Sequence, residues 1–210
     1  MSITLKIKDS LKTIENNVNI ALVELVNDQI NINLTRIFNN VKLLIPRWIK
    51  KQPEIISILS TEPTSLAGQF GFITNADMIV NNIINSVINA TEIKFIKYNK
   101  NFNGGLELRF QPSNFANLLA LPDGHTVYKG GDLHWLDWLL KRGDNMIISN
   151  YQYNPRTGLG RSGLGNMVGG GSFRIPPQFS GTIDNNFITR SFIGNDQEKE
   201  IFYIIEKTLQ

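Results

Sequence analysis

The chain has 210 residues, of which 41% are hydrophobic and 10% aromatic, so it can fold around a substantial core. Its 21 basic and 18 acidic residues give a formal net charge of +3, which is too small for a protein that holds duplex DNA by bulk charge. The absence of cysteine excludes disulfides, thiolate zinc sites and cysteine nucleophiles.

Residues 1–51 predict an N-terminal helical region. An amphipathic helix is expected to begin at Asp9 or Ser10, because either side chain can cap the first free amides. Its apolar face has helical spacing and consists of Leu11, Ile14, Val18, Ala21, Leu22 and Leu25. A second helical pattern runs over 34–51, and Pro46 within it is expected to kink or split the helix.

The next segment continues the helical pattern. Pro53 suits the first turn of a short helix, because a proline there gives up an amide that would be unpaired anyway. Residues 61–72 are typical of a turn, a short helix and a glycine stop. Asn75 is expected to cap a further amphipathic helix, whose apolar face runs from Ile79 to Ile88.

The hydrophobic period then changes from 3.6 to 2. Residues 92–98 and 106–111 alternate apolar and polar side chains, and NKNFNGG between them indicates a hairpin loop. We therefore expect antiparallel, half-buried strands. Further along, Asp132 is expected to cap a short helix that ends at Gly143, and Asn195 or Asp196 to cap a C-terminal amphipathic helix.

A glycine-rich stretch occupies 151–182 and has no acidic residue. Eight of the seventeen glycines lie in it: Gly158, Gly160, Gly163, Gly165, Gly169, Gly170, Gly171 and Gly181. Ordering so many glycines costs conformational entropy, so this stretch is expected to become ordered against something else. Strands over 146–153 and 172–175 would be its stem, which makes the glycine-rich segment the tip of a long hairpin or an unpaired arm.

Together these patterns predict a single α+β domain over 1–210. N-terminal helices and a C-terminal helix would pack on an antiparallel sheet, and 151–182 would form a long glycine-rich hairpin or arm. No apolar run approaches the roughly 20 residues needed to span a bilayer, so we expect no membrane contact and a soluble protein of a cytoplasmic compartment.

Sequence motifs for an enzyme are weak. GLGRSG, starting at Gly158, fits the GxGxxG fingerprint, but the glycine- and proline-containing segment after it cannot form the helix that would face a pyrophosphate. The same stretch misses the GxSxG nucleophile motif, because Leu164 stands where a glycine is needed. His134 and Asp137 could form half of a metal site, but no further ligands complete it. We expect no catalytic residues, no cofactor, no metal and no enzymatic activity.

Six residues of the glycine-rich stretch are candidates for inter-subunit or channel contacts. Three are arginines, which offer forked donors to carboxylate or phosphate, and three are aromatic residues of the kind found at interfaces: Arg156, Arg161, Arg174, Tyr151, Tyr153 and Phe173. The alternatives are a mobile surface loop with incidental charges, and a nucleic-acid-binding module that uses these arginines on phosphate.

Two segments resemble a known family. LLIPRWIKKQPEIISILSTEPTSLAGQFGF is similar to the helix, proline and small-residue turn that lead into the sheet of tail-completion, or head–tail joining, proteins of tailed bacteriophages. SFRIPPQFSGTIDNNFITRSFIGNDQEKEIFYIIEKTLQ resembles the end of that family, from its final strand to its C-terminal helix. WLDWLLKRGDNMIISNYQYNPRTGLGRSG with RIPPQFSGT is similar to neck proteins of contractile-tailed phages.

The resemblance implies a structural virion protein without catalytic residues. It implies a connector ring, usually of six copies, that joins the DNA-filled head to the tail around the DNA channel. Its partners would be other copies of the chain, the portal or its adaptor, and the tail-terminator or tail-tube proteins, with non-specific DNA contact in the channel. The protein would be assembled in the host cytoplasm and located in the virion neck. The glycine-rich stretch and the tryptophan-containing helix at 132–142 depart from a minimal member.

Overall fold

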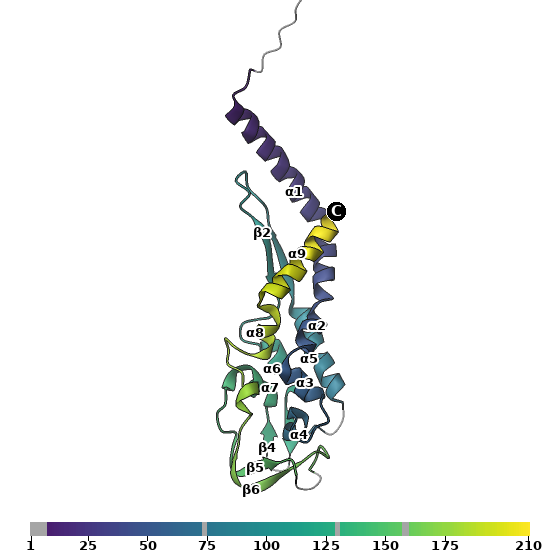
Figure 1. Ribbon diagram of the computed structural model, residues 1–210, viewed down its shortest axis with the longest axis vertical. Coiled ribbons are helices and arrows are strands. Elements are labelled where there is room, and N and C mark those ends of the chain that lie inside the picture. The colour runs from purple at the N-terminus through teal and green to yellow at the C-terminus, as the bar shows by residue number, and fades with distance from the viewer. Residues whose placement is uncertain (1–7, 73–74, 129–130, 157–159) are drawn as a thin grey trace, which may run out of the picture. The chain divides into compact units, whose positions relative to one another are not determined.

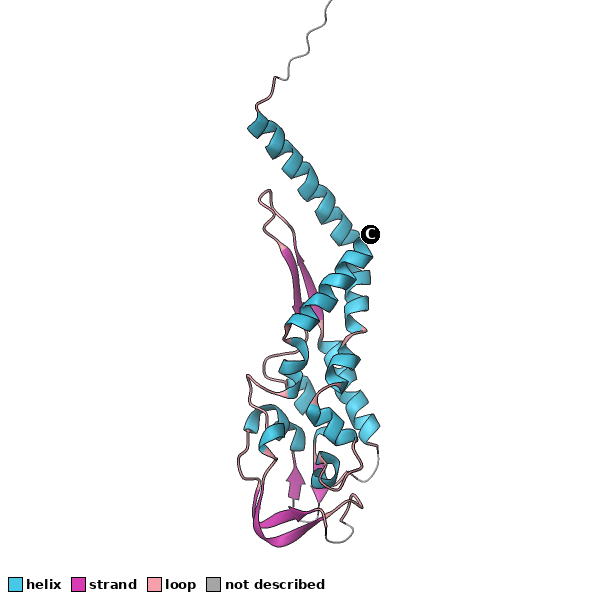
Figure 2. Cartoon of the chain, in the orientation of Figure 1, coloured by secondary structure: helices cyan, strands magenta, loops and turns pink. Residues whose placement is uncertain are grey.

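The structure is a computed structural model that describes residues 8–72, 75–128, 131–156 and 160–210. It combines helices with small sheets, which confirms the α+β class (Figures 1 and 2). Its described strands form three separate two-stranded sheets, β1–β2, β3–β4 and β5–β6. The chain divides into two compact units, and the expectation of one domain over 1–210 stays a prediction.

Unit 1 comprises 1–41, 92–108 and 201–210. Its elements are most of α1 (Leu11–Lys42), β1 (Glu92–Ile96), most of β2 (Gly105–Arg109) and the end of α9 (Asn195–Leu209). Asn27 of α1 fastens the β1–β2 hairpin, since its side-chain amide donates to the Tyr98 carbonyl at 3.0 Å and its oxygen accepts from the Tyr98 amide at 2.8 Å. The two predicted strands are thus found at nearly the predicted positions.

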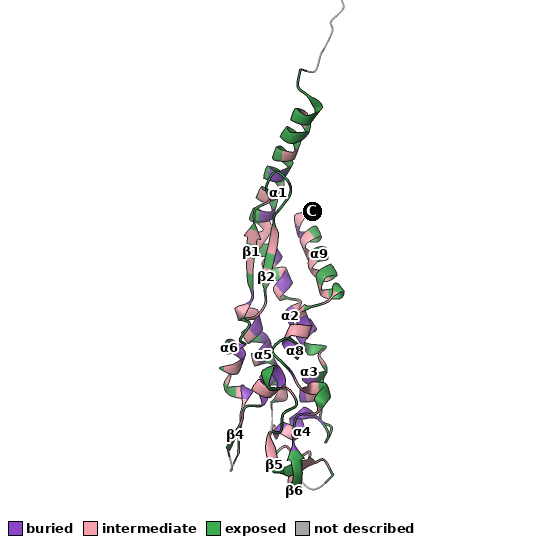
Figure 3. Cartoon of the chain, turned by 90° about the vertical axis from the view of Figure 1, so that its left-hand side faces the viewer, coloured by how far each residue is buried: buried purple, intermediate pink, exposed green. Residues whose placement is uncertain are grey.

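Helix α1 differs from the prediction in length and in the face that it buries. Ser10 caps it by accepting the Thr13 amide at 3.1 Å. The two predicted helices are one helix up to Lys42. The pattern is split near Pro46 as predicted, because a new helix begins at Ile45 with Pro46 in its first turn. The buried residues of α1 are Val23, Ile30, Ile37 and Val41. The face predicted to be apolar and buried is mostly exposed (Figure 3).

Unit 2 comprises 42–91 and 109–200. Its helical elements are α2 (Ile45–Lys50), α3 (Pro53–Leu59), α4 (Leu66–Phe70), α5 (Ala76–Ala90), α6 (Ala116–Leu119), η1 (Pro122–Gly124), α7 (Trp135–Asp137), η2 (Trp138–Arg142), η3 (Pro177–Phe179) and α8 (Phe187–Phe192). Its strands are β3 (Thr126–Tyr128), β4 (Gly131–Leu133), β5 (Ile148–Asn154) and β6 (Asn166–Phe173). Asn75 precedes α5 without a side-chain cap hydrogen bond, so the predicted cap is wrong.

The core of unit 2 is built largely from helices and contains two aromatic clusters. Trp135 stacks on Phe70 with 5.4 Å between ring centroids, and Phe110 stacks on Phe192 at 4.4 Å. An ion pair with one buried member lies between α3 and α8, where the fully buried Glu54 binds the guanidinium of the partly exposed Arg190. These contacts belong to unit 2, which also contains the glycine-rich hairpin.

The predicted helix at 132–142 is only partly correct. Residues up to Leu133 belong to β4, a single α-turn begins at Trp135, and a π-helical turn follows from Trp138 to Arg142. Asp132 therefore does not cap a helix, because the β3–β4 pairing continues to Leu133. Gly143 ends the helical turn with φ of 65°, as the sequence predicts.

Candidate functional site: the glycine-rich hairpin and the pocket at its base

The glycine-rich stretch forms a hairpin. Strand β5 pairs antiparallel with β6, from Ile148 opposite Phe173 to Asn154 opposite Asn166. The hairpin is as predicted, but the return strand begins at Asn166 instead of Ser172, so the GGG segment lies within the strand and not in the tip. Residues 157–159, which include part of GLGRSG, lie outside the described residues.

The GGG segment lies where the pairing of β5 with β6 is irregular. Ser149 lies opposite Ser172 and Tyr151 lies opposite Gly169, so the register shifts between Ser149 and Tyr151. On β6, Gly170 and Gly171 have φ of 96° and 73°. Residues with a Cβ rarely adopt these angles, so the two glycines allow the strand to pass the irregularity.

Tyr153 anchors the hairpin to its own unit. Its hydroxyl donates to the Pro63 carbonyl at 2.7 Å, and its oxygen lies so close to Gly68 and Gly165 that a Cβ at either glycine would be 2.4 or 2.3 Å from it. Burial raises the pKa of the Tyr153 phenol. Among the described glycines of GLGRSGLG, Gly165 thus serves close packing on a tyrosine.

Phe173 and Arg161 also contact their own chain. Phe173 is only 4% exposed and belongs to the core, so it is not a surface anchor. The Arg161 guanidinium donates to the carbonyl of Val127 in β3. Three of the six predicted contact residues, Tyr153, Phe173 and Arg161, therefore hold the hairpin against the rest of unit 2.

Tyr151, Arg156 and Arg174 are exposed. Tyr151 has half of its surface accessible. Arg156 follows the end of β5 near the hairpin tip, and Arg174 follows the end of β6 at the hairpin base. At about 3.3 Å per strand residue, the backbones at these two positions are roughly 20 Å apart, so the arginines do not form one phosphate-binding cluster.

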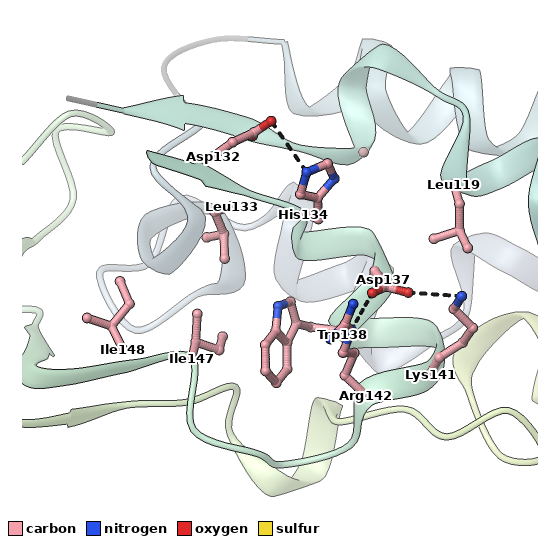
Figure 4. A pocket seen from close by; sticks show the side chains of 11 residues that line it. Leu119, Asp132, Leu133, His134, Asp137, Trp138, Lys141, Arg142, Ile147 and Ile148 are labelled. Carbon is pink, nitrogen blue, oxygen red and sulfur yellow. Dashed lines mark hydrogen bonds and ion pairs between the residues drawn. The ribbon is translucent and has the colours of Figure 1, made fainter. Parts of the chain in front are cut away.

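A pocket of about 520 Å³ lies at the base of the hairpin (Figure 4). Its apolar wall includes Leu119, Leu133, Trp138, Ile147 and Ile148, and its polar groups are Asp132, His134, Asp137, Lys141 and Arg142. Sequence reasoning did not predict this pocket, because its residues come from separate segments that only the fold brings together. The mixture of tryptophan and charge in DLHWLDWLLKR is a signal that could have indicated it.

Asp137 organises the charges of the pocket. Lys141 lies 3.2 Å from one carboxylate oxygen, and the Arg142 guanidinium donates to the other. Burial of the carboxylate would raise the pKa of Asp137, but the hydrogen bonds and charges of Arg142 and Lys141 outweigh burial and hold it below its ordinary value of 3.8. Both cations are thus engaged by one carboxylate within the chain.

The two histidines meet at Asp132, whereas the sequence paired His134 with Asp137. The Asp132 carboxylate lies 2.8 Å from His125 Nδ1 and 3.4 Å from His134 Nε2, and the two imidazole rings stack with 5.3 Å between centroids. Within the described ranges, no group of three or more His, Asp or Glu side chains is arranged to hold a metal ion.

Comparisons with protein-family models, with curated proteins and with solved structures found no match for this chain. Among the helices in the described part of the chain, none combines the length and apolar character that crossing a bilayer requires.

Proposed function

We propose that the protein is a structural subunit of the neck of a tailed bacteriophage. Copies of the chain would form a ring, with six as the expected number, around the DNA channel at the head–tail joint. The proposal is supported by the sequence resemblance and by one structural observation, the β5–β6 hairpin, which is firmly mounted on unit 2 and exposes strand edges.

The hairpin has the properties of an assembly element. Among the described strands, β5 and β6 pair only with each other, so each strand has an outer edge of backbone donors and acceptors. Such edges bind a strand of a neighbouring chain with little demand on side chains, and exposed Tyr151 supplies an aromatic contact beside them. A ring needs a head-to-tail contact that closes, and an element of this kind can provide one half of it.

The mounting of the hairpin determines how the proposal is tested. A deletion of 157–171 would remove most of β6 and the glycine that packs on Tyr153, so it would also disturb unit 2. A double substitution of exposed residues, Tyr151→Ser with Arg174→Ser, leaves the mounting intact. A matched control replaces an exposed aromatic and an exposed cation of α9, Tyr203→Ser with Lys199→Ser.

Native mass measurement and negative-stain imaging of the full chain report ring formation. We expect rings for the wild type and the α9 control, and monomers or open chains for the hairpin variant. Rings that form equally well in the hairpin variant would show that the hairpin does not join subunits.

A nucleic-acid-binding module is the second candidate, favoured by the exposure of Arg156 and Arg174. It predicts that the isolated protein binds duplex DNA, that added salt weakens binding steeply, and that Arg156→Ser with Arg174→Ser abolishes it. Filter binding at several salt concentrations distinguishes this candidate from a ring subunit, whose assembly needs no DNA.

A further inference from the structure

Helix α1 carries an exposed apolar stripe with a seven-residue spacing. The stripe consists of Leu11, Val18, Leu25 and Ile32, which are 85%, 50%, 58% and 73% exposed. Seven residues are two helical turns less about 20°, so these side chains follow one another along one face of the helix. We call this set the α1 stripe.

The opposite face of α1 already has its contacts within the chain. Val23, Ile30 and Ile37 are buried and are also seven residues apart. With 3.6 residues per turn, this buried row lies roughly 140–160° around the helix from the α1 stripe. Asn27, which binds the β1–β2 hairpin, belongs to the same buried side. The α1 stripe therefore lies on the side of the helix away from these described contacts.

The spacing indicates what covers the stripe, and the charges weigh against two other kinds of partner. A sustained seven-residue spacing matches a second helix wound around the first with the same spacing. Over 11–32, α1 carries Glu15, Glu24 and Asp28 against a single cation, Lys12. This excess of negative charge is unfavourable for an anionic membrane surface or for nucleic acid.

We infer that the α1 stripe binds the same stripe of a second copy of this chain, in a parallel, in-register coiled coil. In this arrangement each stripe residue meets its own counterpart, and four apolar layers form. An antiparallel pair would instead place stripe residues opposite the positions three residues further on, which include Asp28 and Thr35.

The flanking residues are compatible with the parallel arrangement. The positions that face each other across a parallel pair would bring Glu24 near Gln29 and Asn31 near Arg36, so no like charges meet there. Asp28 is the exception within the seam, because it would lie near Asp28 of the second copy. Repulsion between the two Asp28 carboxylates weakens the contact. Replacing Asp28 with an apolar residue therefore tests whether the two helices pair in this register.

Cysteine cross-linking tests the arrangement directly, because the natural chain has no cysteine. Val18→Cys and Leu25→Cys, each made singly in the full chain, should give disulfide-linked dimers with a mild oxidant. Ile20→Cys, on the side of α1 away from the stripe, is the control and should remain monomeric. An antiparallel pair can align a residue with its own counterpart at one level only, so cross-linking at both positions requires the parallel register.

Sedimentation equilibrium measures the strength of the contact. Val18→Gln with Leu25→Gln should weaken self-association at least ten-fold, Ile20→Gln should change it less than two-fold, and Asp28→Leu should strengthen it. Absence of cross-linking at residues 18 and 25, or an Asp28→Leu variant that associates no more tightly, would overturn the inference.

The α1 contact is independent of the proposed ring function, since the α1 stripe and the hairpin lie in different units. A hairpin variant that loses rings but still cross-links through α1 supports both proposals. Normal rings in a hairpin variant whose α1 still cross-links would leave the α1 inference standing and refute the hairpin contact alone.

Discussion

The β5–β6 hairpin and the N-terminal half of α1 both expose groups suited to another chain, but they are stabilised in different ways. The hairpin depends on Tyr153 and Phe173 for its packing on the rest of unit 2. The same two strands that carry these residues also expose the edges offered to another chain. In α1 the two tasks lie on opposite faces, because the row that includes Val23 is buried and the stripe that includes Val18 is exposed. Substitutions can therefore separate folding from association in α1 more cleanly than in the hairpin.

The largest effect on stability is expected from the ion pair between α3 and α8 in unit 2. Arg190→Ala leaves the buried Glu54 carboxylate without its cation, and one of its oxygens already has no hydrogen-bond partner among the described residues. The free energy of unfolding should fall by about 3–5 kcal/mol. Arg47→Ala breaks an exposed pair with Glu200 and should cost less than about 1 kcal/mol. Equal losses in urea unfolding of the two variants would contradict the role given to Glu54.

The mounting of the hairpin is tested by Gly165→Ala. The new Cβ would lie 2.3 Å from the Tyr153 hydroxyl oxygen, so the tyrosine must shift and lose its bond to Pro63. We expect a loss of about 1–3 kcal/mol in unfolding free energy. Gly169→Ala is the matched control, since no atom lies within 4 Å of its added Cβ. Tyr153→Phe should account for about 1 kcal/mol through the hydrogen bond alone.

Local patterns predicted much of the fold. The strand alternation after residue 91, the hairpin at the glycine-rich stretch and the glycine stop at Gly143 follow from side-chain period and backbone freedom, which act over a few residues. The buried face of α1 could not be predicted in this way. Both faces of the helix have apolar residues at regular spacing, and only the partners of α1 in the fold determine which face is buried.

The candidate site was predicted less well. The sequence groups Arg156, Arg161 and Arg174 in one segment, but the strand pairing separates the first from the last and Arg161 bonds to Val127. The meeting of His125 with His134 depends on the β3–β4 pairing, which the sequence analysis did not predict. Contacts between residues distant in sequence require the fold, and short motifs do not encode them.

The pocket at the hairpin base gives a pH-dependent prediction. Because the pKa of Asp137 is lower in the folded protein than its ordinary value of 3.8, its ion pairs stabilise the fold above that value. The stabilisation should decline as the pH falls through 3.8 toward the lower folded pKa. Asp137→Asn should thus cost on the order of 1 kcal/mol at pH 7. A cost measured by denaturation that does not shrink below pH 4 would contradict this assignment.

The smallest effect on stability is expected on the α1 stripe, where the comparison of the two regions is sharpest. Val18 and Val23 are the same residue type in the same helix, 50% and 6% exposed, so their substitution by glutamine changes helix propensity equally. Val18→Gln should change the unfolding free energy of the monomer by no more than about 0.5 kcal/mol. Val23→Gln buries an amide and should cost about 1–3 kcal/mol. Val18→Gln should nevertheless weaken self-association, so both unfolding free energies are measured at a protein concentration where the chain is monomeric. Equal losses of stability in the two variants would mean that the α1 stripe belongs to the fold and not to a contact with a second copy.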